Sequence, residues 1–120
     1  MAAQTTFINN LLNAAFRGAT YTGGTITMKL FTTNIPSAGG VEVTGGGYAA
    51  QTLTFAAPSA KKVQTSTSAV YTNLPTSQII VAYGVYSAGV LIDEKALDTP
   101  FQADVNTNSL TVSYSFELGA

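Results

Sequence analysis

A single apolar stretch, residues 78–92, most constrains how this chain can fold. Residues 79–86 carry no charge and are rich in β-branched and aromatic side chains. Residues 87–89 then offer a turn, and residues 90–92 resume the apolar run. Short apolar runs bounded by turn residues are typical of strands that are buried on both faces. We therefore predict a β-hairpin with a layer of structure on each side of it, which makes the chain a β-sandwich.

Residues 5–17 form the only convincing helix in the sequence. Its apolar side chains recur at one-and-four spacing and share one stripe, which consists of Phe7, Ile8, Leu11, Leu12, Ala15 and Phe16. Thr5 or Thr6 is expected to cap the start of this helix. Gly18 is expected to end it in the left-handed conformation, with Arg17 complementing the negative C-terminal end. Asparagines on the opposite side make the helix weak in isolation, so the stripe must pack on the chain's own sheet or on a neighbouring subunit.

Alternating apolar and polar side chains predict the remaining strands. The expected segments are residues 25–33, an edge at 41–44, residues 48–55, a polar strand or loop at 61–67, residues 70–74 and residues 99–103. The strictest alternation is the last one, in which one face carries Leu110, Val112, Tyr114, Phe116 and Leu118. Residues 93–98 hold four charges and are expected to be the most solvated segment.

This spacing of short strands predicts a mainly β protein with a single antiparallel β-sandwich, jelly-roll-like, preceded by one short amphipathic helix. We expect residues 1–24 to form an N-terminal helix or docking arm. Residues 25–120 are expected to form the β-sandwich domain.

Charge is unusually scarce in this chain. Asp, Glu, Lys and Arg make up 9% of the residues, against about 25% in an ordinary globular domain. Serine and threonine, 27 residues in all, supply the polarity instead. Hydroxyl groups cost less to desolvate than ions, so this composition suits a surface that becomes covered by other subunits. A monomer of low charge remains the alternative.

The same composition excludes several kinds of partner. The net charge is −1 and the five basic residues are scattered, whereas nucleic-acid binding needs a clustered cationic face. No segment approaches the roughly 18 apolar residues of a membrane span, and no signal peptide begins the chain. We therefore expect a protein made in the cytoplasm, with neither nucleic acid nor a membrane as a partner.

The sequence also contains no set of catalytic residues. Histidine and cysteine are both missing, which removes the commonest general base, thiolate nucleophiles and most transition-metal sites. Asp93 and Glu94 are adjacent, so on a strand they face opposite ways and cannot work as an acid/base pair. We predict no enzymatic activity, no catalytic residue, no cofactor and no metal.

Two weaker patterns were weighed against this. Residues 104–108 match the start of a calcium-binding loop, but Ser109 and Ser115 stand where that loop needs Gly and Glu, so an Asx-rich turn is favoured. Several tyrosines could also form a sugar-stacking platform: Tyr48, Tyr71, Tyr83, Tyr86 and Tyr114. Core packing with a hydrogen-bonded hydroxyl is the commoner fate of tyrosine and is favoured here.

The chain resembles a family of small virion proteins of tailed bacteriophages. The resemblance rests on the order of several segments, namely residues 10–17, 27–36, 39–49, 54–57, 82–86 and 89–91, of which Glu42-Val-Thr-Gly-Gly-Gly-Tyr-Ala49 is the most specific. Family members often carry tail-fibre labels, and some are cement (decoration) proteins of the capsid. The resemblance implies a non-enzymatic β-sandwich that oligomerises on the virion.

From this resemblance we expect a capsid decoration protein that forms a homotrimer on the assembled head and stabilises it. Its partners would be the major capsid protein and other virion subunits. The side chains expected to bind the capsid or a neighbouring subunit are Phe7, Ile8, Leu11, Leu12, Phe16 and Arg17. The alternative is a phage tail or host-adsorption protein whose tyrosines contact a glycan.

Overall fold

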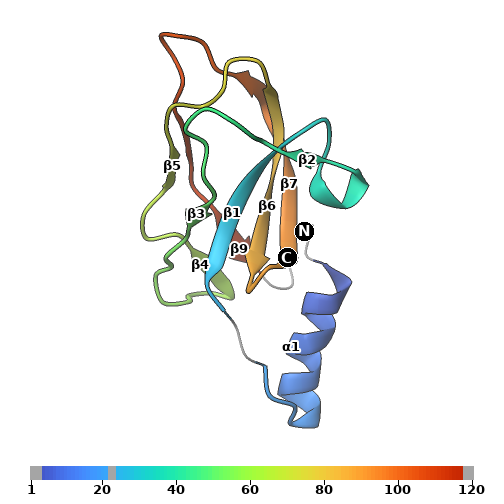
Figure 1. Cartoon of the computed structure of the whole chain (residues 1–120). Coiled ribbons are helices and arrows are strands. Elements are labelled where there is room, and N and C mark those ends of the chain that lie inside the picture. The colour runs from blue at the N-terminus through green and yellow to red at the C-terminus, as the bar shows by residue number, and fades with distance from the viewer. Residues whose placement is uncertain (1–3, 22–23, 118–120) are drawn as a thin grey trace.

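The computed structural model describes residues 4–21 and 24–117. It contains one α-helix, α1 (Thr5–Arg17), and one 3-10 turn, η1 (Pro36–Ala38). The strands are β1 (Ile26–Thr32), β2 (Val41–Glu42), β3 (Gln51–Thr52), β4 (Lys62–Gln64), β5 (Ala69–Tyr71), β6 (Ile79–Ser87), β7 (Val90–Gln102), β8 (Leu110–Val112) and β9 (Ser115–Glu117). Figure 1 shows α1 extending away from the strands. Parts of the expected arm (1–3 and 22–23) and Leu118 of the last strand lie outside the described residues.

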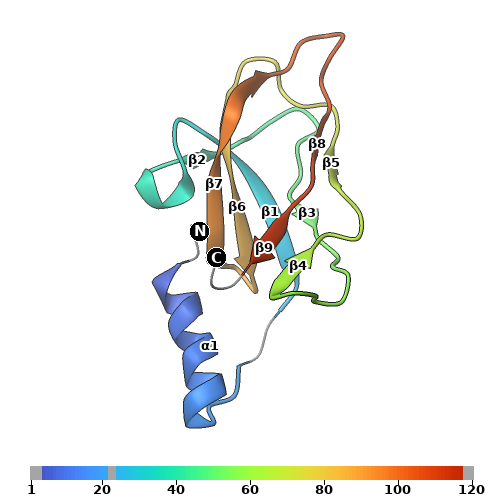
Figure 2. The ribbon, with the colours of Figure 1, turned by 180° about the vertical axis from the view of Figure 1, so that it is seen from behind.

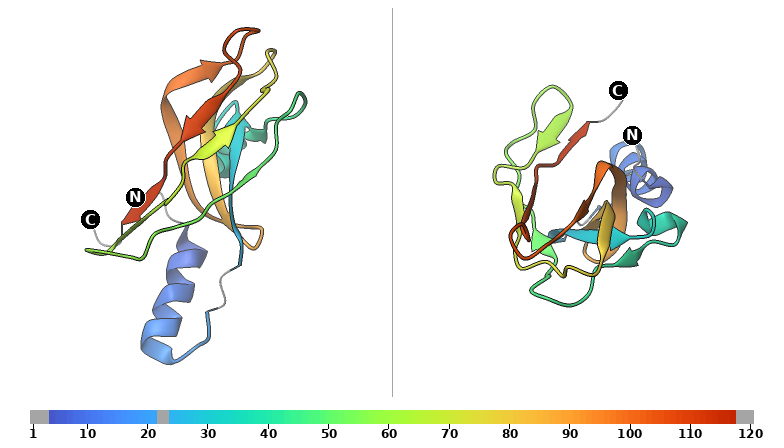
Figure 3. Two further views of the ribbon diagram at one scale, coloured as in Figure 1. Left: turned by 90° about the vertical axis from the view of Figure 1, so that its left-hand side faces the viewer. Right: turned by 90° about the horizontal axis from the view of Figure 1, so that it is seen from above.

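The strands form one large antiparallel sheet and two short antiparallel ladders. The sheet has the order β2-β1-β6-β7, with β3 also paired to β1. The ladders are β4 with β9 and β5 with β8, and Figure 2 shows them from behind. In the end-on view of Figure 3 they lie opposite the sheet. The prediction of a mainly β, antiparallel fold with one N-terminal helix is confirmed.

The predicted hairpin of residues 78–92 is confirmed as β6 and β7. Ala88 and Gly89 form its two-residue turn, and both have positive φ, 49° and 82°, as a type I′ turn requires. β6 is central because it pairs with β1 on one side and β7 on the other. Its outer face is covered at Gly84 by η1, where an added Cβ would come within 2.8 Å of Pro36 Cγ.

The prediction that residues 93–98 are the most solvated segment is wrong. These residues belong to β7, and Glu94 is only 5% exposed. The cause is the pairing with β6, in which Glu94 lies opposite Gly84, together with hydrogen-bond donors that meet both carboxylates. A short run of charge is therefore drawn into the fold because its neighbours continue a strand.

Two predicted strands are shorter than expected. Of residues 48–55 only β3 pairs regularly, although Leu53 is buried as predicted and its N–H donates to the carbonyl of Ile26 (2.8 Å). Residues 110–117 keep their alternating burial but divide into β8 and β9, which pair with different partners. At the division, the Thr65 hydroxyl accepts a hydrogen bond from the N–H of Tyr114 (3.2 Å).

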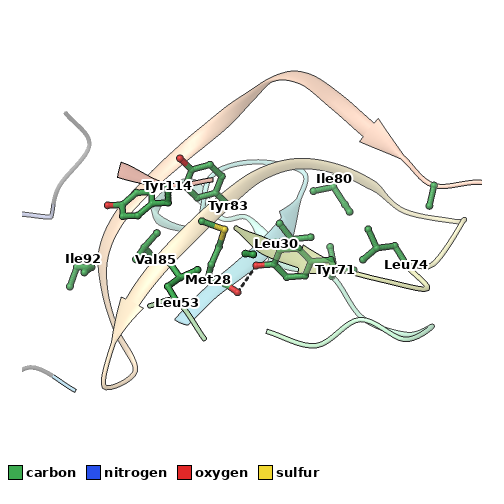
Figure 4. Close-up of a cluster of buried hydrophobic side chains, with 13 residues drawn as sticks. Met28, Leu30, Leu53, Tyr71, Leu74, Ile80, Tyr83, Val85, Ile92 and Tyr114 are labelled. Atoms are coloured by element: carbon green, nitrogen blue, oxygen red, sulfur yellow. Dashed lines mark hydrogen bonds between the residues drawn. The ribbon is translucent and has the colours of Figure 1, made fainter. Parts of the chain in front are cut away.

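The core lies between the sheet and the two ladders (Figure 4). Three tyrosines in and around it use their hydroxyls as hydrogen-bond donors. Tyr71 donates to the carbonyl of Met28 (2.7 Å) and Tyr114 to a carboxylate oxygen of Asp93 (2.6 Å). Tyr48 donates to Glu42 (2.7 Å), and its ring stacks on that of Tyr71 at 6.0 Å between centroids.

Burial raises the pKa of all three phenols. Loss of solvation is the main cause for Tyr48, Tyr71 and Tyr114. For Tyr114, the hydrogen bond to Asp93 and the negative charge of that carboxylate raise the pKa further, because both disfavour a phenolate.

The buried hydroxyl of Tyr71 can be tested against an accessible one. We expect Tyr71→Phe to lower the free energy of unfolding by about 1–2 kcal/mol, because the Met28 carbonyl loses a buried partner. Tyr86→Phe is the control, since the Tyr86 hydroxyl makes no hydrogen bond within the described part of the chain and that side chain is half-buried. Urea unfolding measures both, and equal losses would contradict the assignment.

The raised pKa values also predict how stability depends on pH. The unfolded tyrosines lose their protons near pH 10, whereas the folded ones hold theirs to higher pH. The folded state then binds more protons than the unfolded state, so the free energy of unfolding falls as the pH rises above about 10. Urea titrations at successive pH values should show this decline, with a shallower slope in Tyr114→Phe. A slope identical to that of the wild type would show that Tyr114 does not contribute.

Candidate docking surface on the N-terminal helix

The helix forms where the sequence predicts it but begins differently. It spans Thr5–Arg17 and ends at Gly18, whose φ of 68° and whose N–H bond to Asn13 match the predicted left-handed C-cap. The predicted N-cap, Thr5 or Thr6, is wrong. Gln4 occupies that position in an extended conformation and makes no side-chain capping bond.

Only the base of α1 is attached to the β domain. The N–H of Gln4 donates to the carbonyl of Ile92 in β7 (3.0 Å). The ring of Phe7 packs edge-on against Tyr21 and Phe116, with centroid distances of 6.0 and 5.8 Å. No residue of α1 is fully buried, so the helix is held by its first turns alone.

The six side chains predicted for partner binding divide between two rows of the helix. Phe7 and Leu11, four residues apart, form the row that borders the β domain. Ile8, Leu12 and Phe16 form the second row along the helix. Exposure along this row rises from half-buried Ile8 to 49% at Leu12 and 82% at Phe16, and Arg17 beside it is also exposed. We call Leu12, Phe16 and Arg17 the exposed end of α1.

A buried carboxylate ties the helix base to the rest of the fold. One oxygen of Glu94 accepts the N–H of Ser37 in η1 (2.9 Å). The other accepts the Ser37 hydroxyl and, at 3.3 Å, the side-chain amide of Gln4. Asp93 supports this arrangement, because its carboxylate accepts the N–H of Glu94 (2.9 Å) and the hydroxyl of Tyr114. Glu94 thus connects β7 to both η1 and the residue that precedes α1.

Sequence reasoning missed the role of Glu94, although a signal was present. Glu94 lies two residues after Ile92, so the two share a face of β7, and Ile92 belongs to the core. The parity of the strand therefore indicated burial, whereas the charged composition of the segment indicated solvent.

An apolar cavity of about 290 Å³ opens beside the base of the helix. Its walls come from α1, from the sheet and from the β4–β9 ladder, and they include Phe7, Leu11, Phe55, Val63 and Phe116. These five side chains are half-buried rather than buried, so the cavity is accessible from outside.

The tyrosine platform that was considered for glycan binding is not formed. Tyr71, Tyr83 and Tyr114 are buried in the core, with 1%, 8% and 5% of their surface exposed. Tyr48 is stacked on Tyr71, and Tyr86 is stacked on Phe31 in the sheet. The favoured interpretation, core packing with hydrogen-bonded hydroxyls, is confirmed for Tyr71 and Tyr114.

The calcium-like segment is an Asx turn. One carboxylate oxygen of Asp104 accepts the N–H groups of Asn106 (2.8 Å) and Thr107 (2.7 Å). Within residues 4–21 and 24–117, no three acidic, His or Cys side chains come together as a metal site. No helix in that part of the chain is long and apolar enough to cross a membrane.

The Glu94 connection generates a direct prediction. Glu94→Ala should lower the free energy of unfolding by about 2–4 kcal/mol, because buried donors on Ser37 lose their acceptor. Hydrogen exchange should also become faster in α1 and η1. Glu117→Ala is the control, since Glu117 is exposed and makes no ion pair among the described residues. Equal effects of the two substitutions would refute the role assigned to Glu94.

Comparison with known proteins identifies the family of this chain. Residues 2–113 match the model of the family described as podophage GP4 fiber I protein gp80. Searches of curated proteins and of solved structures found no significant match. The match covers nearly the whole chain and agrees with the family class indicated by the sequence segments above. This chain therefore belongs to the podophage GP4 fiber I protein gp80 family, and so to the small structural proteins of tailed-phage virions.

Proposed function

We propose that this chain is a non-enzymatic fibre subunit of the virion that is held on the particle by the exposed end of α1. The observation that carries the proposal is Phe16, which is 82% exposed at the far end of a helix attached only at its base. Leu12 lies one turn away on the same row and is also exposed. An aromatic and an aliphatic side chain presented together on a projecting helix suit a surface that a partner covers.

The chemistry of the chain supports a structural role. The sequence has no histidine and no cysteine. The carboxylates that are drawn into the fold, Asp93 and Glu94, accept hydrogen bonds from Tyr114, Ser37 and Gln4. Their oxygens hold the fold together and are not directed at an open site, which leaves no general acid or base for catalysis.

The shape supports attachment at one end. The molecule measures 52 × 29 × 24 Å along its principal axes. Figure 3 shows α1 at one end of the long axis, with the β5–β6 and β7–β8 loops at the other. The description of the matched family names a fibre protein, which supports a fibre location for this chain. An end-on subunit of this kind would present the two loops to the surroundings.

A capsid decoration protein is the second candidate. In that role the chain would form a trimer on the assembled head and bind the major capsid protein through the same end of α1. The scarcity of charge favours it, because five basic and six acidic residues leave large neutral areas that neighbouring subunits can cover at low cost in desolvation. Like any virion protein it would be made in the host cytoplasm.

Fractionated virions test the proposal and separate the two candidates. Virions are assembled with wild-type chain, with Phe16→Ser or with Val105→Ser, and the chain is counted in heads and in tails. Val105 is the matched control because it is 86% exposed but lies in the β7–β8 loop. We expect Phe16→Ser to be lost from particles and Val105→Ser to be retained.

The location of the retained chain then assigns the role. A few copies per particle in the tail fraction would support the fibre role. Hundreds of copies on heads would replace it with the decoration role. Normal incorporation of Phe16→Ser would refute attachment through α1.

A further inference from the structure

We propose that the partner of the exposed end of α1 is a second copy of this chain, whose apolar cavity beside the helix base receives Phe16. The inference rests on the proposed attachment through α1 and names its partner. It arises because one chain carries both an uncovered aromatic side chain and an open apolar cavity at a different place on its surface.

The cavity has the size and chemistry to take a phenyl ring. Its volume is about 290 Å³, and an apolar cavity of roughly 150 Å³ is enough to bind benzene. Phe55, Phe116 and Tyr114 line it, so an incoming ring would meet aromatic edges and faces at several angles. Its polar lining is limited to hydroxyl-bearing side chains, so a charged group would lose solvation there without gaining a counter-ion.

Phe16 cannot fill the cavity of its own chain in this fold. Leu11 already forms part of the wall, and Phe16 lies five residues farther along α1, a rise of roughly 7.5 Å. The helix carries it away from the β domain (Figure 1), and 82% of its surface is exposed. The cavity and the side chain therefore face different molecules.

The charges beside the two surfaces are complementary. Arg17 follows Phe16, and Glu117 follows Phe116 at the cavity wall. Both are exposed, and neither forms an ion pair within the described part of the chain. Lys62 is the cross-strand neighbour of Glu117 and lies too far from it for an ion pair. Insertion of Phe16 would bring Arg17 toward this carboxylate.

A contact of this kind joins two different surfaces, so it is heterologous. Such contacts close into a ring if the rotation between copies allows it and otherwise extend as a filament. Closure after three copies would produce the trimer expected from the family resemblance. The rival arrangement is symmetrical packing of α1 against α1, in which Phe16 meets its own equivalent and the cavity stays empty.

The absence of tryptophan from the sequence allows the two arrangements to be separated by fluorescence. A Phe16→Trp chain at low concentration supplies the only indole signal. It is titrated with a Phe16→Ser chain, which has no aromatic group at that position but keeps the cavity. Insertion into the cavity predicts a saturable blue shift of the emission. Symmetrical helix packing predicts little shift, because the partner lacks the apposed ring.

Two further partners locate the binding surface. The double variant Phe16→Ser/Val63→Glu places a carboxylate in the cavity wall and should raise the concentration needed for the shift by at least about tenfold. Phe16→Ser/Gln64→Glu adds the same charge at the next, exposed residue of β4 and should behave like Phe16→Ser. Circular dichroism establishes that each partner is folded. If Val63→Glu does not fold, Val63→Phe, which occupies the cavity without adding charge, replaces it.

Either of two results would overturn the inference. A blue shift unaffected by substitution of Val63 would place the contact outside the cavity. No shift with any partner would show that a second copy does not bind the exposed end of α1. The virion experiment remains independent, since loss of Phe16→Ser from particles without self-association would leave attachment through α1 intact with a different virion protein as the partner.

Discussion

The position of β6 between β1 and β7 is the constraint on which the rest of the structure depends. Its inner face supplies Tyr83 and Val85 to the core, and its outer face is covered at Gly84 by the 3-10 turn. Because β7 pairs with β6 along most of its length, the charged residues of β7 are drawn into the fold. Glu94 is buried in this way, and its carboxylate then fixes both the 3-10 turn and the approach to α1.

This chain of dependence explains why α1 has two unlike halves. Hydrogen bonds from Gln4 and ring contacts from Phe7 hold its base against β7 and β9. The apolar core of the sandwich continues only as far as this base. Beyond it the helix has no sheet to lie on, so Leu12 and Phe16 stay exposed. The uncovered apolar surface follows from the length of the helix relative to the β domain.

The sequence predicts the regular parts of this fold because they satisfy one local rule each. The hairpin follows from an apolar run with a turn at its centre, and the last two strands follow from alternation that survives a break at Tyr114. The helix follows from one-and-four spacing. The family class follows from motif order, which the family match over residues 2–113 confirms.

The remaining features depend on contacts between distant segments. The burial of Glu94 requires donors from Ser37 and Gln4, which lie 57 and 90 residues away. The apolar stripe of α1 indicates which side chains share a surface, but periodicity carries no information on what covers them. The division into an attached and an exposed row appears only when β7 and β9 are in place. The tyrosines likewise needed the fold to show that they belong to the core.

The most direct test of the account is a cryo-electron microscopy map of the virion in which this chain is located. The account predicts that density for a neighbouring protein chain encloses Phe16 and Leu12, while the β5–β6 and β7–β8 loops point away from the particle. A map in which those loops contact the particle and the exposed end of α1 faces solvent would contradict it.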